Sequence, residues 1–233
     1  MAEVFESHHF VNERCTDSAV GLSPVPGVHE IEGLSEKIGE TKYRVAYRSG
    51  SYAVKKTKPF VPKRYFGLSF GIPTSLYTTL KFAIRDLSVF EYEQYLKVIA
   101  MTPPRLHEHF ARVFSPLAVN GETFAINELV MNDDGSVSKM LRSFGPCNDQ
   151  QFWQDMDRLE HFFLQAKIYY FGMGCNNVCV REQADGRLVP VLIDYKRIGA
   201  RTFWQQFWLF LPFVKKLKLK RRFSKIRKRY RID

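Results

Sequence analysis

Alternation of hydrophobic and polar positions predicts short strands in the first half of the chain. Three such segments are separated by Gly39 and by the turn Arg48–Ser51; they are Leu34 to Ile38, Tyr43 to Tyr47 and Tyr52 to Lys56. Two further segments, Phe110 to Val119 and Thr123 to Val130, flank an Asn-Gly pair at residues 120–121, which is typical of a hairpin. The pattern therefore predicts a small five-stranded unit.

Two segments have the spacing of helices. In residues 86–99, Leu87, Phe90, Tyr95 and Ile99 lie near a common face, and the prolines after Thr102 end the segment. A second helix is expected from Gln150 to about Ile168, with Asn148 as its cap. The first helix would separate the third strand from the fourth.

Two other regions lack regular patterns. Residues 1–30 are expected to form a polar arm, since Ser23–Gly27 contains two prolines. Residues 57–84 are expected to be an irregular insertion, because Pro59, Pro62 and Pro73 interrupt an aromatic segment that also holds two glycines.

The most informative stretch is residues 168–199. A polar loop, Gly172–Asn177, leads into the apolar strand Val178–Val180, and a second apolar strand, Leu188–Ile193, ends in Asp194. Strands often end in Asp or Asn because these side chains favour turns. An apolar hairpin with an amide at one end and a carboxylate at the other also holds the metal ion under nucleotide phosphates in protein-kinase-like folds.

Composition and cysteine usage limit the class of protein. The 233 residues are 45% hydrophobic and 15% aromatic, enough for a full core in one domain or two small lobes. The four cysteines form no CxxC pair and no secretory signal pattern opens the chain, so a reducing cytoplasmic setting is expected. His107 and His109 lack a second ligand pair and do not predict a metal site.

The net charge of +11 is concentrated near the C-terminus. Eleven Lys and Arg residues lie between Lys215 and Arg231, and only Asp233 opposes them. The aromatic run Phe203–Phe213 before them is too short to span a bilayer, which needs about 20 apolar residues.

This region has two main interpretations. Its helical spacing fits either a helix packed on the core or a helix at an anionic membrane surface, with nucleic acid a less favoured partner. The membrane interpretation uses Trp204, Phe207, Trp208, Lys215, Lys216, Lys218, Lys220, Arg221 and Arg222.

From about Leu34 to Arg222, the order of these elements resembles the YrbL-like family, the PhoP regulatory network proteins, which are compact relatives of protein kinases. The resemblance implies an α+β, protein-kinase-like fold with a small five-stranded N-lobe carrying one helix and a truncated helical C-lobe. The divisions would be an arm at 1–30, an N-lobe at 31–130 with the 57–84 insertion, a minimal C-lobe at 131–214 and a basic tail at 215–233.

The resemblance also implies an ATP and Mg²⁺ site. Lys55, in Ala53-Val54-Lys55, would hold the phosphates and pair with Glu91. The Glu128 carbonyl and Val130 amide would meet the adenine edge, Gly39 would belong to the loop over the phosphates, and Asn177 and Asp194 would bind the metal. Lys56 would point to the opposite face of its strand.

Four departures affect activity. Tyr170-Phe171-Gly172 stands where His-Arg-Asp would be, so Gly172 replaces the carboxylate that accepts the substrate proton. The phosphate loop has one glycine, with Glu40 beside it to repel phosphate, and only 39 residues follow Asp194. Lys196 replaces the glycine of Asp-Phe-Gly, and the sequence leaves open whether its side chain fills the phosphate space and inhibits the site.

Three functions follow from these features. The first is an atypical kinase or pseudokinase with a regulatory role in a bacterial envelope-linked pathway, placed in the cytoplasm or peripherally on the inner face of the membrane. The second is an active small-molecule or lipopolysaccharide-core (glycolipid) kinase, with Asp155 or Asp157 as base and the basic, aromatic tail holding the glycolipid. The third is a membrane or protein interaction module that binds no nucleotide.

Overall fold

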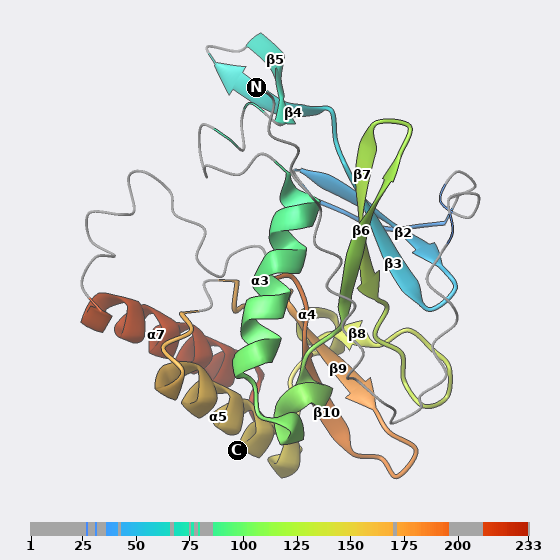
Figure 1. Ribbon diagram of the computed structural model, residues 1–233. Helices are drawn as coiled ribbons and strands as arrows, with labels where there is room; N and C mark the ends of the chain where they lie inside the picture. The colour runs from blue at the N-terminus through green and yellow to red at the C-terminus, as the bar shows by residue number, and fades with distance from the viewer. Residues whose placement is uncertain are drawn as a thin grey trace, which may run out of the picture.

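A five-stranded antiparallel sheet forms one end of the molecule (Figure 1). Its strands lie in the order β1 (Lys37–Glu40), β2 (Arg44–Ser49), β3 (Tyr52–Thr57), β7 (Glu122–Glu128) and β6 (Val113–Val119). The computed structural model describes residues 36–41, 43–65, 68–74, 86–169, 172–195 and 212–232, with single residues 27, 31, 76 and 79. All five predicted strands are present with shifted boundaries, and the protein is a mixed α+β structure.

The pleat of the sheet gives neighbouring lysines opposite directions. Lys55 pairs with Ala46 and Ala125, whereas Lys56 pairs with residues 45 and 124. Successive side chains of a strand point to opposite faces. Lys55 therefore shares a face with residues 44, 46, 125 and 127, and Lys56 faces away.

A second hairpin follows β3, where the sequence predicted an irregular insertion. Among the described residues, strands β4 (Phe60–Tyr65) and β5 (Leu68–Pro73) pair only with each other (Figure 1). Both are edge strands, so a proline can occupy an outward position without breaking an interior ladder; Pro62 lies opposite Gly71. The prediction for this segment was wrong because it treated proline as excluding all strands.

Helix α3 (Leu87–Met101) packs on the sheet through a partly unexpected face. Asp86 caps it by accepting hydrogen bonds from the amides of Ser88 and Val89, at 2.7 and 3.2 Å. Its buried residues are Leu87, Ser88, Glu91, Gln94 and Val98, whereas Phe90, Tyr95 and Ile99 are half-buried. The predicted face is confirmed in part, since Leu87 is buried and Tyr95 and Ile99 pack against the main core, but polar side chains occupy much of the buried face.

The other part of the molecule is built around a hairpin and two helices. Strands β8 (Lys139–Met140), β9 (Val178–Glu182) and β10 (Leu188–Leu192) form a three-stranded sheet. Helix α5 (Gln150–Gln165), capped by Asp149 rather than Asn148, packs on β10 and on α7 (Pro212–Tyr230). The short helices η1 (Pro104–His109) and α4 (Leu141–Phe144) complete this part (Figure 1).

The predicted basic tail is largely this helix α7, and it belongs to the core. Leu219, Phe223, Ile226 and Tyr230 are buried in the main hydrophobic cluster with α5 and the hairpin. Tyr230 also accepts a main-chain hydrogen bond from Cys147 at 2.8 Å. In the sequence, the many Lys and Arg residues of this segment obscured the apolar residues that recur at helical spacing on one face of the helix. None of the described helices is apolar over a length sufficient to cross a membrane.

Candidate functional site

A buried carboxylate joins α3 to three strands of the five-stranded sheet. Glu91 has no exposed surface, and its Oε1 lies 2.8 Å from Lys55 Nζ and accepts a 3.3 Å hydrogen bond from Asn127 Nδ2. Its Oε2 pairs with Arg44 Nη1. The expected Lys55–Glu91 pair is present; Arg44 and Asn127 were not anticipated from the sequence.

The strand register explains why these side chains meet. Arg44, Lys55 and Asn127 lie on β2, β3 and β7, and their positions in the antiparallel ladder all fall on the face toward α3. The residues around Lys55 on this face are small, namely Ala46, Ala53 and Ala125. The stem of Lys55 is therefore bordered by short side chains.

The charges of this cluster do not cancel. Arg44 is buried and bound to one oxygen of Glu91, whereas Lys55 is 20% exposed. Two cations facing one carboxylate leave a formal charge of +1. Because Arg44 can keep Glu91 paired, the Lys55 ammonium has charge available for an anionic ligand on its exposed side.

Asn177 and Asp194 lie at the same end of the hairpin. Leu192 pairs with Val178, and the next amide, of Ile193, donates to Asn177 O at 3.0 Å. Asn177 Nδ2 donates to Gly172 O at 2.6 Å, which leaves its Oδ1 as the group that can bind a cation. Asp194 follows with φ of 69°, a left-handed conformation that Asp tolerates better than most residues.

Tyr195 anchors the backbone directly after Asp194. Its side chain is buried, and its hydroxyl lies 2.8 Å from Ala111 O and 3.0 Å from Leu192 O. The ring packs edge-to-face on Tyr95 of α3, with centroids 5.3 Å apart. The end of the hairpin is thus tied to the same helix that carries Glu91.

An ion pair between Arg181 and Glu128 links the hairpin to the sheet that carries Lys55. Burial raises the pKa of the Cys179 thiol on β9 to about 11, and the charges of Arg181 and Lys55 oppose this rise. Glu128, at the end of β7, accepts a 3.0 Å hydrogen bond from Arg181 and one of 2.9 Å from the Arg112 amide. Residues 128–130 therefore form the connection between the sheet and the hairpin.

Val130 is buried where this connection meets the hairpin. It packs with Ala111, Cys179, Val189 and Val191. The side chains of Glu128 and Val130, the two residues predicted to meet adenine, therefore stabilise the fold. Any nucleotide contact at Glu128 or Val130 would use the main chain.

The predicted phosphate loop is built differently from expectation. Gly39 pairs with Ala46 beside an irregularity in the β1–β2 register. Glu40 forms ion pairs with Lys37 and Lys58, and their side-chain hydrogen bonds lower its pKa to about 2. Two cations therefore offset the charge that was expected to repel phosphate.

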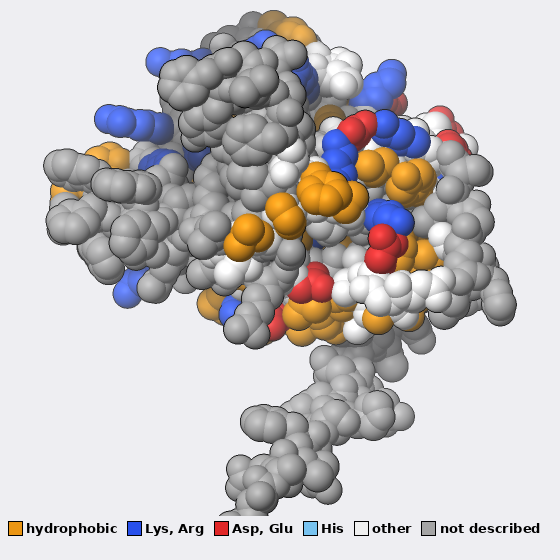
Figure 2. Space-filling model, turned by 90° about the horizontal axis from the view of Figure 1, so that it is seen from above, with side chains coloured by type: hydrophobic (Ala, Val, Ile, Leu, Met, Phe, Trp, Pro, Cys, Tyr) orange, Lys and Arg blue, Asp and Glu red, His pale blue; other side chains and the backbone are white. Residues whose placement is uncertain are grey.

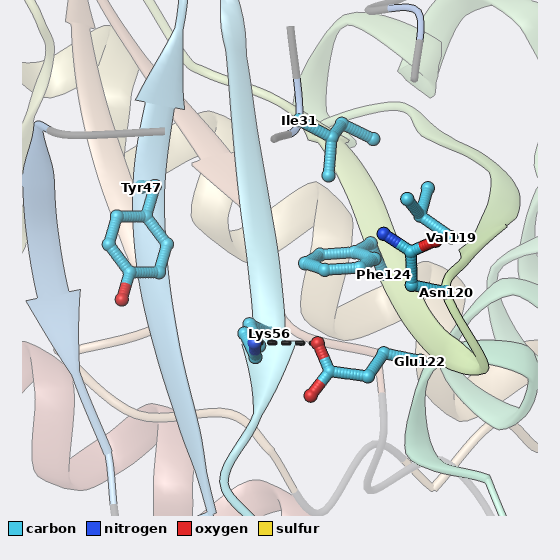
Figure 3. A pocket seen from close by; sticks show the side chains of 7 residues that line it. All are labelled: Ile31, Tyr47, Lys56, Val119, Asn120, Glu122 and Phe124. Carbon is cyan, nitrogen blue, oxygen red and sulfur yellow. Dashed lines mark ion pairs between the residues drawn. The ribbon is translucent and has the colours of Figure 1, made fainter. Parts of the chain in front are cut away.

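Lys56 belongs to a separate pocket on the opposite face of the sheet (Figure 3). This pocket has a volume of about 420 Å³, and Tyr47, Phe124 and Ile31 are among its lining residues. Lys56 Nζ lies 2.5 Å from Glu122 Oε2 and 5.8 Å from the centre of the Phe124 ring. Lys56 is thus paired with a carboxylate of its own, whereas Lys55 shares Glu91 with Arg44.

The position predicted for the catalytic base holds Gly172 and no carboxylate. Gly172 is buried and its carbonyl accepts from Asn177. Asp155 is fully buried in α5 and binds Arg158 at 2.8 Å and Arg187 at 3.1 Å.

These contacts place Asp155 far from Asp194. Arg187 precedes β10 and Asp194 follows it, so about 20 Å of strand separates the two ends. Asp157 pairs instead with Arg227 of α7. Neither aspartate suits the role of base for a ligand at Asp194.

Several predicted residues lie outside the described part of the chain. They are Tyr170, Phe171, Lys196, Trp204, Phe207 and Trp208, together with most of residues 1–30. Within the described residues, no group of three His, Cys, Asp or Glu side chains could hold a metal ion. Asn177 and Asp194 supply two oxygen ligands, a number that suits Mg²⁺ when phosphate and water complete its coordination.

His109 has a structural environment. It is buried, and its Nδ1 lies 3.0 Å from Pro190 O. Burial lowers its pKa below 6.5, although the hydrogen bond to Pro190 and the charges of Asp155 and Glu108 act in the opposite direction and Arg187 reinforces the lowering. His107 is exposed and bonds Thr102 O, so the two histidines form no shared site.

Replacing His109 with Asn is expected to flatten the acid sensitivity of stability. Below its ordinary pKa of 6.5 the unfolded chain takes up a proton that folded His109 resists, so stability should fall as the pH drops below 6.5. This one group contributes up to about 1.4 kcal/mol per pH unit. Urea denaturation from neutral to mildly acidic pH measures the slope, with His107→Asn as the control; equal slopes for the two variants would contradict the assignment.

Comparisons with known proteins give only distant likenesses. No protein-family model and no curated protein matches the chain. A solved structure of a kinase, titled "PpkA-294 apo form", is similar with a TM-score of 0.37 and 17% sequence identity. The likeness covers 71% of this chain and 58% of that one, so the chain spans less than two thirds of the neighbour's length.

Proposed function

We propose that the protein is a kinase-like nucleotide-binding protein, an atypical kinase or pseudokinase that binds ATP with Mg²⁺. The observation that carries the proposal is the ion pair between Lys55 on β3 and Glu91 on α3. In protein kinases this pair of elements supplies the lysine that holds nucleotide phosphates. Here Arg44 also neutralises Glu91, which leaves Lys55 charge for the phosphates.

The metal would lie at the end of the β9–β10 hairpin. Asp194 and the Asn177 Oδ1 would bind Mg²⁺, and Mg²⁺ would neutralise phosphate charge. Tyr195 would hold Asp194 in place through its contacts with Ala111 O and Tyr95. The main chain of Glu128 and Val130 would meet the adenine edge, and Gly39 would lie over the phosphates.

The absence of a carboxylate at Gly172 favours nucleotide binding over rapid phosphotransfer. General-base catalysis contributes about 10²–10⁴ in rate, and Asp155 and Asp157 are engaged elsewhere. An active glycolipid kinase is therefore the less favoured alternative. A regulatory role in a bacterial envelope-linked pathway, in the cytoplasm or at the inner face of the membrane, rests on the resemblance to YrbL-like proteins.

The matched pair Lys55→Met and Lys56→Met tests the proposal. Lys55→Met is expected to weaken Mg-ATP binding about 10–100-fold, because a charged hydrogen-bonding group contributes about 1.5–3 kcal/mol. Lys56→Met, on the opposite face, should bind as the unmodified protein does. Calorimetric titration of Mg-ATP measures both. If the unmodified protein gives no binding, or if the two variants lose affinity equally, the proposal fails.

A further inference from the structure

Helix α7 contains more positive charge than its packing uses. Between Pro212 and Ile232 there are eleven Lys and Arg residues and no acidic residue. Lys215 lies in the first turn of the helix and Lys216 follows it, near the end where the helix dipole disfavours cations. Helix stability alone does not account for this composition.

A small number of these cations stabilise the fold through contacts with the rest of the protein. Arg227 pairs with Asp157 and Glu160 of α5, and Arg222 donates to Met173 O at 2.9 Å. Together with the buried side chains of residues 219, 223, 226 and 230, they fix which side of α7 faces the core. Arg222, predicted as a surface cation, is therefore a structural residue.

The opposite side of α7 combines apolar and basic residues in one line. Phe213 and Leu217 are 58% and 48% exposed, and Lys220, Arg221 and Lys228 are exposed farther along the helix. At 100° per residue these five span about 100° of the helix, with Leu217, Arg221 and Lys228 opposite the buried face and Phe213 and Lys220 toward one side of it. In the described part of the chain, no carboxylate forms an ion pair with these three cations. Figure 2, which looks at the molecule from the end opposite α7, shows side chains of both charge signs mixed over that side.

We infer that this outer face of α7 docks on an anionic lipid bilayer. Each Lys or Arg near such a surface contributes about 1 kcal/mol, and exposed aromatic and aliphatic side chains enter the interface. Nucleic acid would use the same cations but gives no reason for Phe213 and Leu217 to be exposed in line with them. The inference is independent of nucleotide binding, since α7 contributes no residue to the proposed ATP site.

Vesicle sedimentation with the full chain tests this surface. The protein is expected to bind phosphatidylcholine vesicles that contain phosphatidylglycerol, and not phosphatidylcholine alone. The variant Lys220→Glu/Arg221→Glu/Lys228→Glu should bind about 100-fold more weakly, from three lost contributions of about 1 kcal/mol each. Phe213→Ser/Leu217→Ser should weaken binding about tenfold or more. Circular dichroism checks that the variants stay folded.

A charge-matched control separates the surface from net charge. Lys97→Glu/Arg105→Glu/Lys139→Glu reverses three exposed cations outside α7, and this variant should keep most of the affinity. Equal losses for the two triple variants would overturn the inference, as would no binding of unmodified protein to anionic vesicles at low salt. Tighter binding to duplex DNA, unaffected by Phe213→Ser/Leu217→Ser, would assign the face to nucleic acid instead.

Discussion

Glu91→Ala is expected to lower the free energy of unfolding by about 3–5 kcal/mol, because removing one partner of a buried ion pair leaves an uncompensated charge. Arg44 is 3% exposed, and its Nε and Nη2 have no hydrogen-bond partner even with Glu91 present. The variant would leave the whole guanidinium without its carboxylate. The loss of Glu91 is less costly for Lys55, since its ammonium can reach water. Urea denaturation followed by circular dichroism measures the change.

Two further variants make this prediction specific to the ion pair. Glu93→Ala, on the exposed side of the same helix, should change stability by less than about 0.5 kcal/mol. The double variant Arg44→Met/Glu91→Leu should recover much of the loss, because apolar side chains can replace a buried pair without leaving a charge. If Glu91→Ala behaved like Glu93→Ala, the cluster would not hold α3 on the sheet.

The strands were predictable from the sequence because their signal is local. A period of two already assigned Lys55 and Lys56 to opposite faces, and the structure confirms this through their different strand partners. The face of α3 was not predictable in the same way. A prediction from hydrophobic spacing considers only apolar residues. Glu91 can be buried because it pairs with Arg44 on β2, which lies 47 residues earlier in the chain.

The two regions that differ most from expectation have opposite composition. In β4 and β5, prolines suggested an irregular segment, but a ribbon with two edges accepts them at outward positions. In α7, charge suggested a tail, but Leu219, Phe223 and Ile226 return at helical spacing and reach the core. Long Lys and Arg side chains on the flanks of such a helix can extend their charged ends into water while the apolar stripe stays buried.

For the end of the hairpin, the sequence predicted which two residues matter but not the conformation that they adopt. The sequence identified Asn177 and Asp194, since one precedes and one follows an apolar hairpin. It did not indicate the left-handed backbone of Asp194, the orientation of the Asn177 amide by Gly172 O, or the anchoring of Tyr195. These depend on contacts between segments that are far apart in the chain.

Asp194→Asn is expected to remove the Mg²⁺-dependent part of ATP binding. Changes around a metal ligand already cost about 10–100-fold in metal affinity, so loss of the ligand's own charge should cost at least about 100-fold. Asn is the suitable replacement because it has the same shape and also tolerates φ of 69°, which would strain Ala. Titration of ATP with and without Mg²⁺ measures the effect, and Asp185→Asn in the hairpin turn is the matched control.

A double-variant cycle shows whether Asp194 and Lys55 act on one ligand. If both contact the same phosphates, directly or through Mg²⁺, Lys55→Met should cost less affinity in the Asp194→Asn background than in the unmodified protein, with a coupling of about 0.5–3 kcal/mol. Additive losses would mean that the two groups act at separate sites. In that case the buried Lys55–Glu91 pair would be a purely structural contact, since independent sites cannot share a nucleotide.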